Sequence, residues 1–207
     1  MAVLAIRVML SGCHAAAAAR PRRPTPCVAR WWLYASIVIA ALAPMLAGAA
    51  TAREYQIKAV FLFNFTQFVI WPSGSFASAH APLVIGVLGP DPYGSYLDET
   101  TRGEKVDGRP LVVERYRRVE DVANCHVLFV SSAGAGSMAD TLAQLKGRSI
   151  LTVTDTDAAG GQGGIIRFFT ENSHIRLRID LPAAKAAGLE ISSKLLRAAE
   201  VIGADGD

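Results

Sequence analysis

Arginine side chains on one face of a predicted β-hairpin offer this chain its clearest recognition chemistry. Residues 165–171 and 174–180 each alternate apolar and polar side chains, and Asn172–Ser173 between them are typical turn residues, so the pattern predicts two antiparallel strands. Arg176 and Arg178 fall on the same face of the second strand, because alternate residues of a strand point the same way. Paired arginines can bind a carboxylate through two parallel hydrogen bonds. The spacing therefore indicates a ligand or partner contact.

Two further charged residues, Arg167 and Glu171, lie across the same predicted hairpin. Together with Arg176 and Arg178 they form the candidate binding site for a ligand or a partner. The alternative is an exposed sheet face on which opposite charges pair across the strands, an arrangement that needs no ligand. The sequence favours neither interpretation over the other.

Cys125 is the other residue that could carry chemistry. It is the one cysteine after residue 52, so the predicted domain cannot form an internal disulfide. A small residue directly before an apolar run such as 126–131 is usually buried, which favours a structural role over the alternative of a redox thiol. His126 is poorly placed to activate the thiol, because neighbouring residues of a strand point to opposite faces.

Other catalytic and cofactor patterns are missing from the sequence. It has no HxH, HExxH or CxxC spacing for a metal and no GxSxG turn for a hydrolase. Residues 89–94 follow a predicted strand, a position where open α/β sheets bind ligands, but two prolines and the lack of a phosphate-loop pattern favour a plain turn. Residues 160–164 include four glycines and predict a flexible loop. We therefore expect no catalytic residue, no metal and no cofactor, and a protein that is not an enzyme.

The N-terminal segment over residues 1–52 has the pattern of a secretory signal peptide. A basic, proline-rich stretch over 20–30 precedes the uncharged run 31–46, and the small residues that follow contain two A-x-A matches, after Ala49 and Ala52. The alternative is a retained transmembrane anchor, since 22 uncharged residues could span a bilayer. Pro44 and the small residues favour cleavage. Initiation at Val28 would give a signal of ordinary length, so the residues before about 28 are candidates for an untranslated stretch.

Removal of this segment changes the charge of the protein. The whole chain has a formal charge of +3, but five of its 21 basic residues and none of its 18 acidic residues precede residue 52, which leaves −2 on the remainder. Nucleic-acid-binding domains usually carry a strong basic surplus. The mildly acidic remainder therefore excludes nucleic acid as the expected partner.

Residues 53–207 are expected to form one α/β domain. Short apolar runs alternate with helical segments, which predicts a single three-layer domain with a mostly parallel sheet and a C-terminal β-hairpin. The first helix is apolar on nearly all sides and is therefore expected to be buried. The predicted strands are 82–89, 109–116, 126–131 and 149–154, and the predicted helices are 53–71, 93–101, 137–146, 182–188 and a last one ending at 201.

Five segments in order resemble the YfiR-like family of periplasmic regulators. The resemblance covers essentially all of 53–202. It rests on Tyr55-x-x-Lys58-Ala59-x-Phe61-Leu62-x-Asn64-Phe65 with Phe68-Val69-x-Trp71-Pro72, on Val87-Leu88-Gly89-x-Asp91-Pro92-Tyr93-Gly94, on Cys125-His126-Val127-Leu128-Phe129-Val130, on Leu151-Thr152-Val153-Thr154-Asp155, and on Ile191-Ser192-Ser193-Lys194-Leu195-Leu196.

The resemblance implies a non-enzymatic protein of the Gram-negative periplasm. Such proteins bind the periplasmic sensor region of an inner-membrane diguanylate cyclase and inhibit it, which lowers cyclic-di-GMP and thereby biofilm formation. Members of the family dimerise, so a homodimer is implied as well, and the membrane is reached only through the cyclase. The alternative is a periplasmic small-molecule-binding sensor, with residues 89–94 or the arginine pair holding an anionic ligand.

The sequence departs from the family at one cysteine. The resemblance implies that the counterpart of Cys125 has a disulfide partner in the first strand, where this chain has Gly86. An internal redox switch is therefore not expected here. A disulfide between two chains would require an exposed Cys125.

Overall fold

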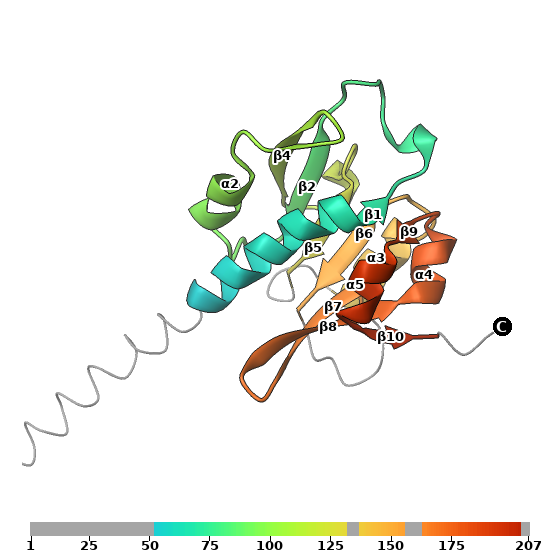
Figure 1. Ribbon diagram of the computed structural model, residues 1–207. Helices are drawn as coiled ribbons and strands as arrows, with labels where there is room; N and C mark the ends of the chain where they lie inside the picture. Colours follow the sequence, from blue (N-terminus) through green and yellow to red (C-terminus); the bar gives the residue numbers. More distant parts are fainter. Residues whose placement is uncertain (1–51, 132–136, 156–162, 204–207) are drawn as a thin grey trace, which may run out of the picture. The chain divides into compact units, whose positions relative to one another are not determined.

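The computed structural model describes residues 52–131, 137–155 and 163–203 (Figure 1). The predicted signal peptide, apart from Ala52, and residues 160–162 of the glycine-rich stretch lie outside these ranges. Within the described residues, no helix has the length and apolar character required to cross a membrane.

One mixed sheet of eight strands forms the centre of the described chain, in the order β10-β8-β7-β6-β5-β2-β4-β3. The pairs from β7 through β6, β5 and β2 to β4 are parallel, and β10 is parallel to β8, whereas β7–β8 and β3–β4 are antiparallel. The strands are β2 (Leu83–Leu88), β3 (Lys105–Val106), β4 (Arg109–Tyr116), β5 (Val127–Val130), β6 (Leu151–Thr154), β7 (Ile166–Glu171), β8 (His174–Asp180) and β10 (Glu200–Ile202).

The central strands β2, β5 and β6 are buried at every position. A strand buried on both faces carries an unbroken apolar run rather than an alternating one. This is why the sequence of β2, for example, reads LVIGVL. The prediction of an α/β fold with a mostly parallel sheet and a late hairpin is confirmed.

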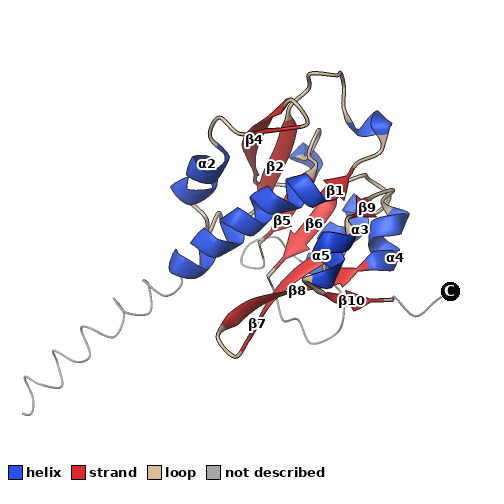
Figure 2. Ribbon diagram, viewed as in Figure 1, coloured by secondary structure: helices blue, strands red, loops and turns tan. Residues whose placement is uncertain are grey.

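Helices cover both faces of the sheet (Figure 2). The first helix, over residues 52–68, contributes to the larger core cluster together with α2 (Ser95–Thr101), α4 (Leu181–Ala186) and α5 (Ser193–Arg197). The opposite face is covered by α3 (Met138–Leu145), which packs in a second, smaller cluster with Leu128 and Val130 of β5. Two single turns of 3-10 helix, η1 (Ser73–Ser75) and η2 (Val119–Asp121), lie in the connections.

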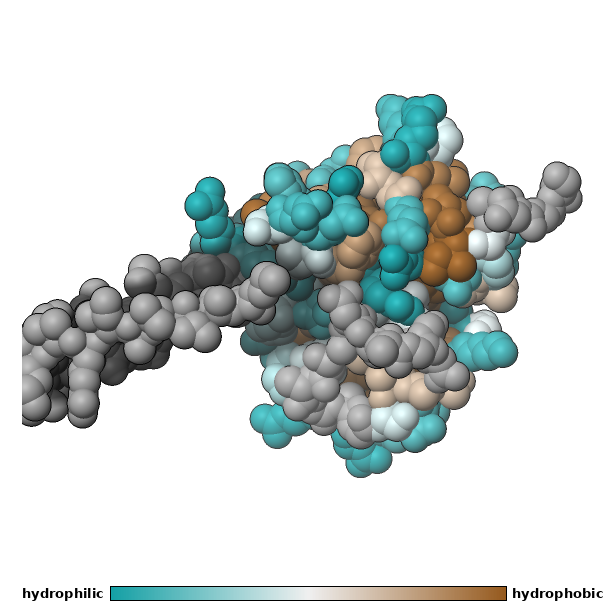
Figure 3. All heavy atoms as spheres, turned by 90° about the horizontal axis from the view of Figure 1, so that it is seen from below, coloured by the Kyte–Doolittle hydropathy of each residue, from teal (hydrophilic) through white to brown (hydrophobic). Residues whose placement is uncertain are grey.

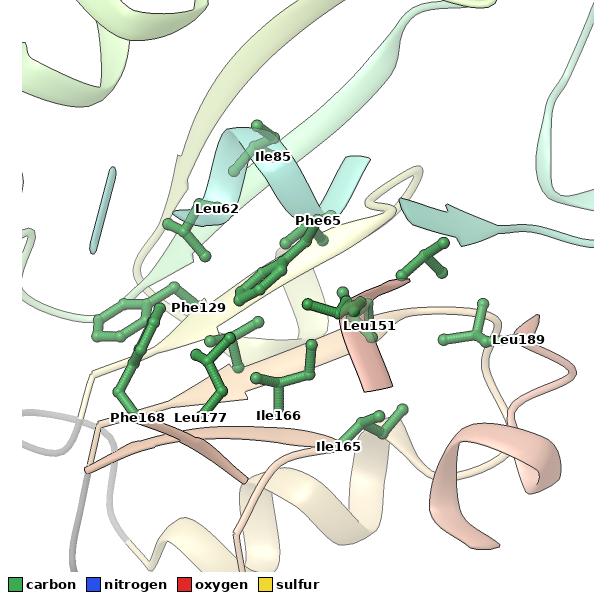
Figure 4. Packing of buried hydrophobic residues seen from close by; sticks show 14 of the residues in the cluster. Leu62, Phe65, Ile85, Phe129, Leu151, Ile165, Ile166, Phe168, Leu177 and Leu189 are labelled. Atoms are coloured by element: carbon green, nitrogen blue, oxygen red, sulfur yellow. The ribbon is translucent and has the colours of Figure 1, made fainter. Parts of the chain in front are cut away.

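Phe65 lies at the centre of the contact between the first helix and the sheet (Figure 4). Its side chain is fully buried. Its ring stacks with Phe168 of β7 at a centroid distance of 5.9 Å and with Phe61 of its own helix at 6.3 Å. Aromatic pairs at such distances add to the stabilisation that burial alone provides.

The first helix differs from its prediction in two respects. It ends at residue 68 instead of 71, because Val69–Ile70 form a short strand, β1, that pairs antiparallel with β9 (Glu190–Ile191). It is also not buried all round, since Ile57 and Val60 on its outer side are 45% and 47% exposed. The prediction of a fully buried helix was wrong because helices of this layer have the sheet on one side only.

The predicted last helix through residue 201 was also too long. Ser192 caps α5 by accepting a hydrogen bond from the Lys194 amide, but the helix ends at Arg197. Residues Glu200–Ile202 instead form β10, which pairs with Arg178–Asp180 of β8. The β-branched Val201 and Ile202 favour such a strand.

Replacement of Phe65 by alanine should lower the free energy of unfolding by about 3–5 kcal/mol, because it removes a buried aromatic ring and leaves a cavity. Val60→Ala, on the outer side of the same helix, is the matched control and should change it by about 0.5 kcal/mol or less. Urea denaturation followed by circular dichroism measures both. Similar losses in the two variants would contradict the packing described here.

Candidate functional site

The four charged residues of the predicted site lie on one face of the β7–β8 hairpin. Arg167 is directly opposite Arg178 in the register, and Glu171 is opposite His174. Since Arg176 is two residues from Arg178 on β8, the side chains of these two arginines point to the same face of the sheet. The structure therefore brings Arg167, Glu171, Arg176 and Arg178 together as a hairpin face, as the alternation predicts.

The arginines of β8 in this hairpin face are paired with carboxylates of the same chain. Arg176 Nε lies 3.4 Å from Glu171 Oε2, and both side chains are more than half exposed. Arg178 Nη2 donates to Glu200 Oε2 at 2.9 Å, and its guanidinium lies over the Phe169 ring, 4.7 Å from the centroid. These are the cross-strand ion pairs of the second interpretation. Glu200 was missed because the sequence placed it in a helix.

Exposed ion pairs of this kind can exchange partners easily. Each stabilises a fold by only about 0–1 kcal/mol, because water and salt screen the charges. A carboxylate from another molecule can therefore replace Glu171 or Glu200 with little loss of stability. The hairpin face is thus suited to recognition even though its arginines on β8 are paired in the free chain.

The tip of the hairpin extends beyond the rest of the sheet (Figure 1). Its two turn residues, Asn172 and Ser173, have φ angles of 49° and 62°, as expected for the two-residue turns that suit twisted strands. All residues from Thr170 to His174 are exposed. Figure 3 shows that hydrophilic side chains stand beside an apolar area on the underside of the molecule, the side on which the hairpin and β10 lie.

Cys125 lies in the smaller core cluster and is 5% exposed. Its thiol donates to the Val127 carbonyl at 3.2 Å. Burial raises the pKa of the Cys125 thiol to about 12. Since the thiolate is the reactive form, the thiol is unreactive near neutral pH. Its burial also means that a disulfide between two folded chains would first have to uncover it.

Gly86 is next to Cys125, as the family resemblance implies for a partner cysteine. A Cβ atom at Gly86 would lie 2.7 Å from Cys125 Sγ and from Tyr116 Cε2, and 2.8 Å from Leu128 Cδ1. The glycine therefore makes room for three neighbouring side chains in the middle of β2. Where the resemblance implies a disulfide, this chain has close packing.

His126 is not available as a base for the Cys125 thiol. Its Nδ1 accepts a hydrogen bond from the Val84 amide at 3.1 Å, and its Nε2 lies 3.2 Å from the Ser75 carbonyl. The ring packs against Trp71 and Phe76, whereas Cys125 belongs to the other core cluster. A catalytic pair of these two residues is therefore inconsistent with the geometry.

The loop over residues 89–94 is held by Arg115 of β4. The Arg115 guanidinium donates to Asp91 Oδ2 at 2.7 Å, to both Asp98 oxygens at 2.6 and 3.1 Å, and to the Gly94 carbonyl at 3.0 Å. The other Asp91 oxygen accepts from the Tyr93 amide at 2.8 Å. The Arg115 guanidinium and the Tyr93 amide, which could contact an anion, are thus already bonded to groups of the same chain. This agrees with the interpretation of residues 89–94 as a plain turn.

A buried polar cluster at the carboxyl end of β6 was missed by the sequence analysis. Lys58 Nζ lies 2.6 Å from Glu54 Oε1 and 3.6 Å from Asp155 Oδ2, with the Lys58 side chain 6% and the Asp155 side chain 9% exposed. Tyr55 Oη donates to the same Asp155 oxygen at 2.8 Å. Burial and, to a smaller extent, this hydrogen bond raise the pKa of Tyr55. A lysine on a helix face that is otherwise apolar was the available signal, because a buried lysine needs a partner.

Tyr93 lies beside this cluster. Its side chain is 1% exposed, and its ring contacts those of Tyr55 and Phe129 edge to face, with centroids 5.4 and 4.9 Å apart. Its hydroxyl has no hydrogen-bond partner within the described ranges. Burial raises the pKa of Tyr93 well above its usual value, so the hydroxyl stays neutral.

These features define an α/β protein with an exposed hairpin whose β8 arginines pair with carboxylates of the same chain. In the parts of the chain that the structure describes, no cluster of three or more histidine, cysteine or acidic residues could hold a metal ion.

The YfiR/HmsC-like family model matches residues 55–200, and the chain therefore belongs to this family. The resemblance seen in the sequence is thus confirmed, and it indicates a regulatory role in cyclic-di-GMP signalling. No curated protein matches the chain.

A cysteine at position 86 should form a disulfide with Cys125 under oxidising conditions, because the two sulfur atoms would be within bonding reach. The oxidised Gly86→Cys variant should be more stable than its reduced form by about 3–4 kcal/mol, since the bond closes a long loop. Peptide mapping without reduction identifies the bond, and urea denaturation measures the stability. Gly86→Ser is the matched control, and free thiols at both positions after oxidation would contradict the geometry.

Removal of the Asp155 carboxylate should lower the free energy of unfolding by about 2–4 kcal/mol, because it leaves the Lys58 ammonium and the Tyr55 hydroxyl short of a buried partner. Glu54→Ala removes the other carboxylate near the same lysine. Glu54 is 38% exposed, so this matched control should lose about 1 kcal/mol or less. An equal loss in Asp155→Ala and Glu54→Ala, measured by urea denaturation, would show that burial does not distinguish the two pairs.

Proposed function

We propose that this protein is a non-enzymatic periplasmic regulator that binds the sensor region of an inner-membrane diguanylate cyclase and inhibits it. The observation that carries the proposal is the match of the YfiR/HmsC-like family model to residues 55–200, nearly the whole described chain. The N-terminal signal-peptide pattern supports the compartment, because it would deliver the domain to the periplasmic side of that membrane.

The hairpin face is the surface proposed to contact the cyclase. It combines four charged side chains with an exposed, projecting tip. Carboxylates of a partner can replace Glu171 and Glu200 in these ion pairs with little loss of stability. Arg176 is the first residue to test, since its side chain is 59% exposed. Its distance to Glu171, 3.4 Å, is also longer than the 2.9 Å between Arg178 and Glu200.

Inhibition by binding requires a difference in affinity. A regulator that bound the active and inactive states of the cyclase equally well would leave their ratio unchanged. The protein is therefore proposed to bind the inactive state more tightly. A shift of that equilibrium from 1:99 to 99:1 would require about a 10⁴-fold preference.

A second candidate is a sensor of small molecules, favoured by a hollow between α3 and α4. The hollow has a volume of about 400 Å³ and is lined by residues such as Leu142, Ile165 and Ala183. Ligand pockets usually measure about 300–1,000 Å³. A thermal-shift assay with a metabolite panel distinguishes this function, because a ligand at 100 times its dissociation constant adds about 2.7 kcal/mol of stability.

Deletion of the gene should raise cyclic-di-GMP in a strain that retains its diguanylate cyclases, and the wild-type gene should restore the lower level. The Arg176→Ala/Arg178→Ala variant should restore it incompletely, because it lacks both guanidinium groups of β8. Extraction and mass spectrometry measure the nucleotide.

The matched control is Arg117→Ala/Arg118→Ala, which removes two exposed arginines outside the hairpin and should complement fully. An unchanged cyclic-di-GMP level in the deletion strain would count against the regulatory function itself. Full complementation by the hairpin variant would count only against the proposed surface.

A further inference from the structure

His126 is a buried histidine whose ring is bonded entirely to backbone groups. The residue as a whole is 3% exposed. Nδ1 lies 3.1 Å from the Val84 amide nitrogen at the start of β2, and Nε2 lies 3.2 Å from the Ser75 carbonyl oxygen in η1. The ring stacks on Phe76 with a centroid distance of 4.4 Å and a tilt of 20°. The ring therefore joins the sheet to the segment that follows the first helix.

These two hydrogen bonds define which nitrogen carries the proton. A backbone amide can only donate, so Nδ1 must offer a lone pair to Val84. Nε2 therefore carries the hydrogen and donates it to the Ser75 carbonyl. A second proton would have to go onto Nδ1, where it would face the Val84 N–H and remove that hydrogen bond. The closed arrangement thus favours the neutral ring.

The charges around the ring oppose protonation further. Arg109 of β4 lies on Phe76, with its guanidinium carbon 3.8 Å from the ring centroid, so a cation stands behind the phenyl ring on which His126 is stacked. No carboxylate forms a hydrogen bond or ion pair with His126 among the described residues. Cys125 belongs to the other core cluster, and His80 of the same segment is exposed.

The segment over residues 72–82 is attached to the sheet at two places. One is His126, through the Ser75 carbonyl and the Phe76 ring. The other is Arg109, whose Nη1 donates to the Ser78 carbonyl at 2.8 Å and to the Ala81 carbonyl at 3.0 Å. The Arg109 attachment does not depend on pH near neutrality, because arginine stays charged. The His126 attachment does, although Nε2–H donates to Ser75 in either charge state, because a second proton removes the bond of Nδ1 to Val84 and charges a ring that the segment shields from water.

We propose that residues 72–82 form an acid-sensitive latch, which is closed while His126 is neutral and opens from the sheet when the ring gains a proton. Opening would free the Ser75 carbonyl and the Phe76 ring and alter the surface next to β1 and β2. The device does not depend on the identity of the protein's partner. It is therefore testable on the isolated chain.

The direction of the pH effect follows from where the proton is bound. Burial lowers the pKa of His126 below its usual value of 6.5. In the open state the ring is in water and regains a value near that. Below about pH 6.5 the open state therefore binds a proton that the closed state excludes, and opening becomes up to about tenfold more favourable per pH unit. The preference for opening stops growing once the pH falls to the lowered pKa that His126 has in the closed state. Above about pH 6.5 the closed latch has its full stability.

Hydrogen exchange of the Val84 amide, measured by NMR on the full-length protein, reports opening directly because this amide donates to the ring. Its protection factor, corrected for the intrinsic exchange rate at each pH, should fall by up to about tenfold per unit below pH 6.5. The ring nitrogen shifts of His126 should show the proton on Nε2 above pH 7. Protection that does not change between pH 7.5 and 5, or a proton on Nδ1, would overturn the latch.

Three variants separate His126 from other causes. His126→Asn keeps an acceptor near Nδ1 but cannot be protonated, so the pH dependence should disappear. His80→Gln removes the exposed histidine of the same segment and should leave the dependence unchanged. Arg109→Ala should lower the protection at every pH with the same slope, and it serves as a second test if His126→Asn does not fold. An unchanged slope in His126→Asn, or Val84 protection equal at every pH to that of the Phe129 amide in the core, would also overturn the proposal.

Discussion

The burial of β2, β5 and β6 on both faces is the constraint on which the rest of the structure depends. Strands with apolar side chains above and below are stable only when helices cover each side. The first helix covers one side with the fully buried Leu62 and Phe65, and α3 covers the other with Leu145. The parallel pairing from β7 to β4 agrees with this, because parallel sheets occur almost only where both faces are covered.

The same burial explains why Lys58 and His126, which lie inside the fold, are bonded to other groups of the chain. Lys58 has two carboxylates, and His126 has a donor and an acceptor from the backbone. A polar group in such surroundings is costly unless it is paired. These contacts also join segments that are distant in sequence, since Tyr55 and Asp155 are 100 residues apart. The buried polar groups thus fix how the first helix and the segment after it are seated on the sheet.

The longer elements could be predicted from the sequence because their signals are local. Uninterrupted apolar residues identified β2, and alternation with two turn residues identified the hairpin, whose register confirms that Arg167, Glu171, Arg176 and Arg178 share a face. The short strands β1, β9 and β10 were missed, because two or three residues carry no period. Their formation depends on partners far along the chain, as in the pairing of Val69 with Ile191. For the same reason the pairing of Arg178 with Glu200 and that of Lys58 with Asp155 could not be predicted.

Buried and exposed charges therefore have different consequences in this protein. The contacts of Lys58 and His126 are surrounded by packed side chains, so a change in either alters the fold around it. The ion pairs of Arg176 and Arg178 stand in water and can be broken and re-formed at little energetic cost. The proposed function uses both kinds of contact, because the fold must persist while the ion pairs on its surface exchange partners. In this chain the two kinds are separated in space, with the exchangeable pairs on a hairpin that projects from the sheet and the fixed ones under the first helix and the segment over residues 72–82.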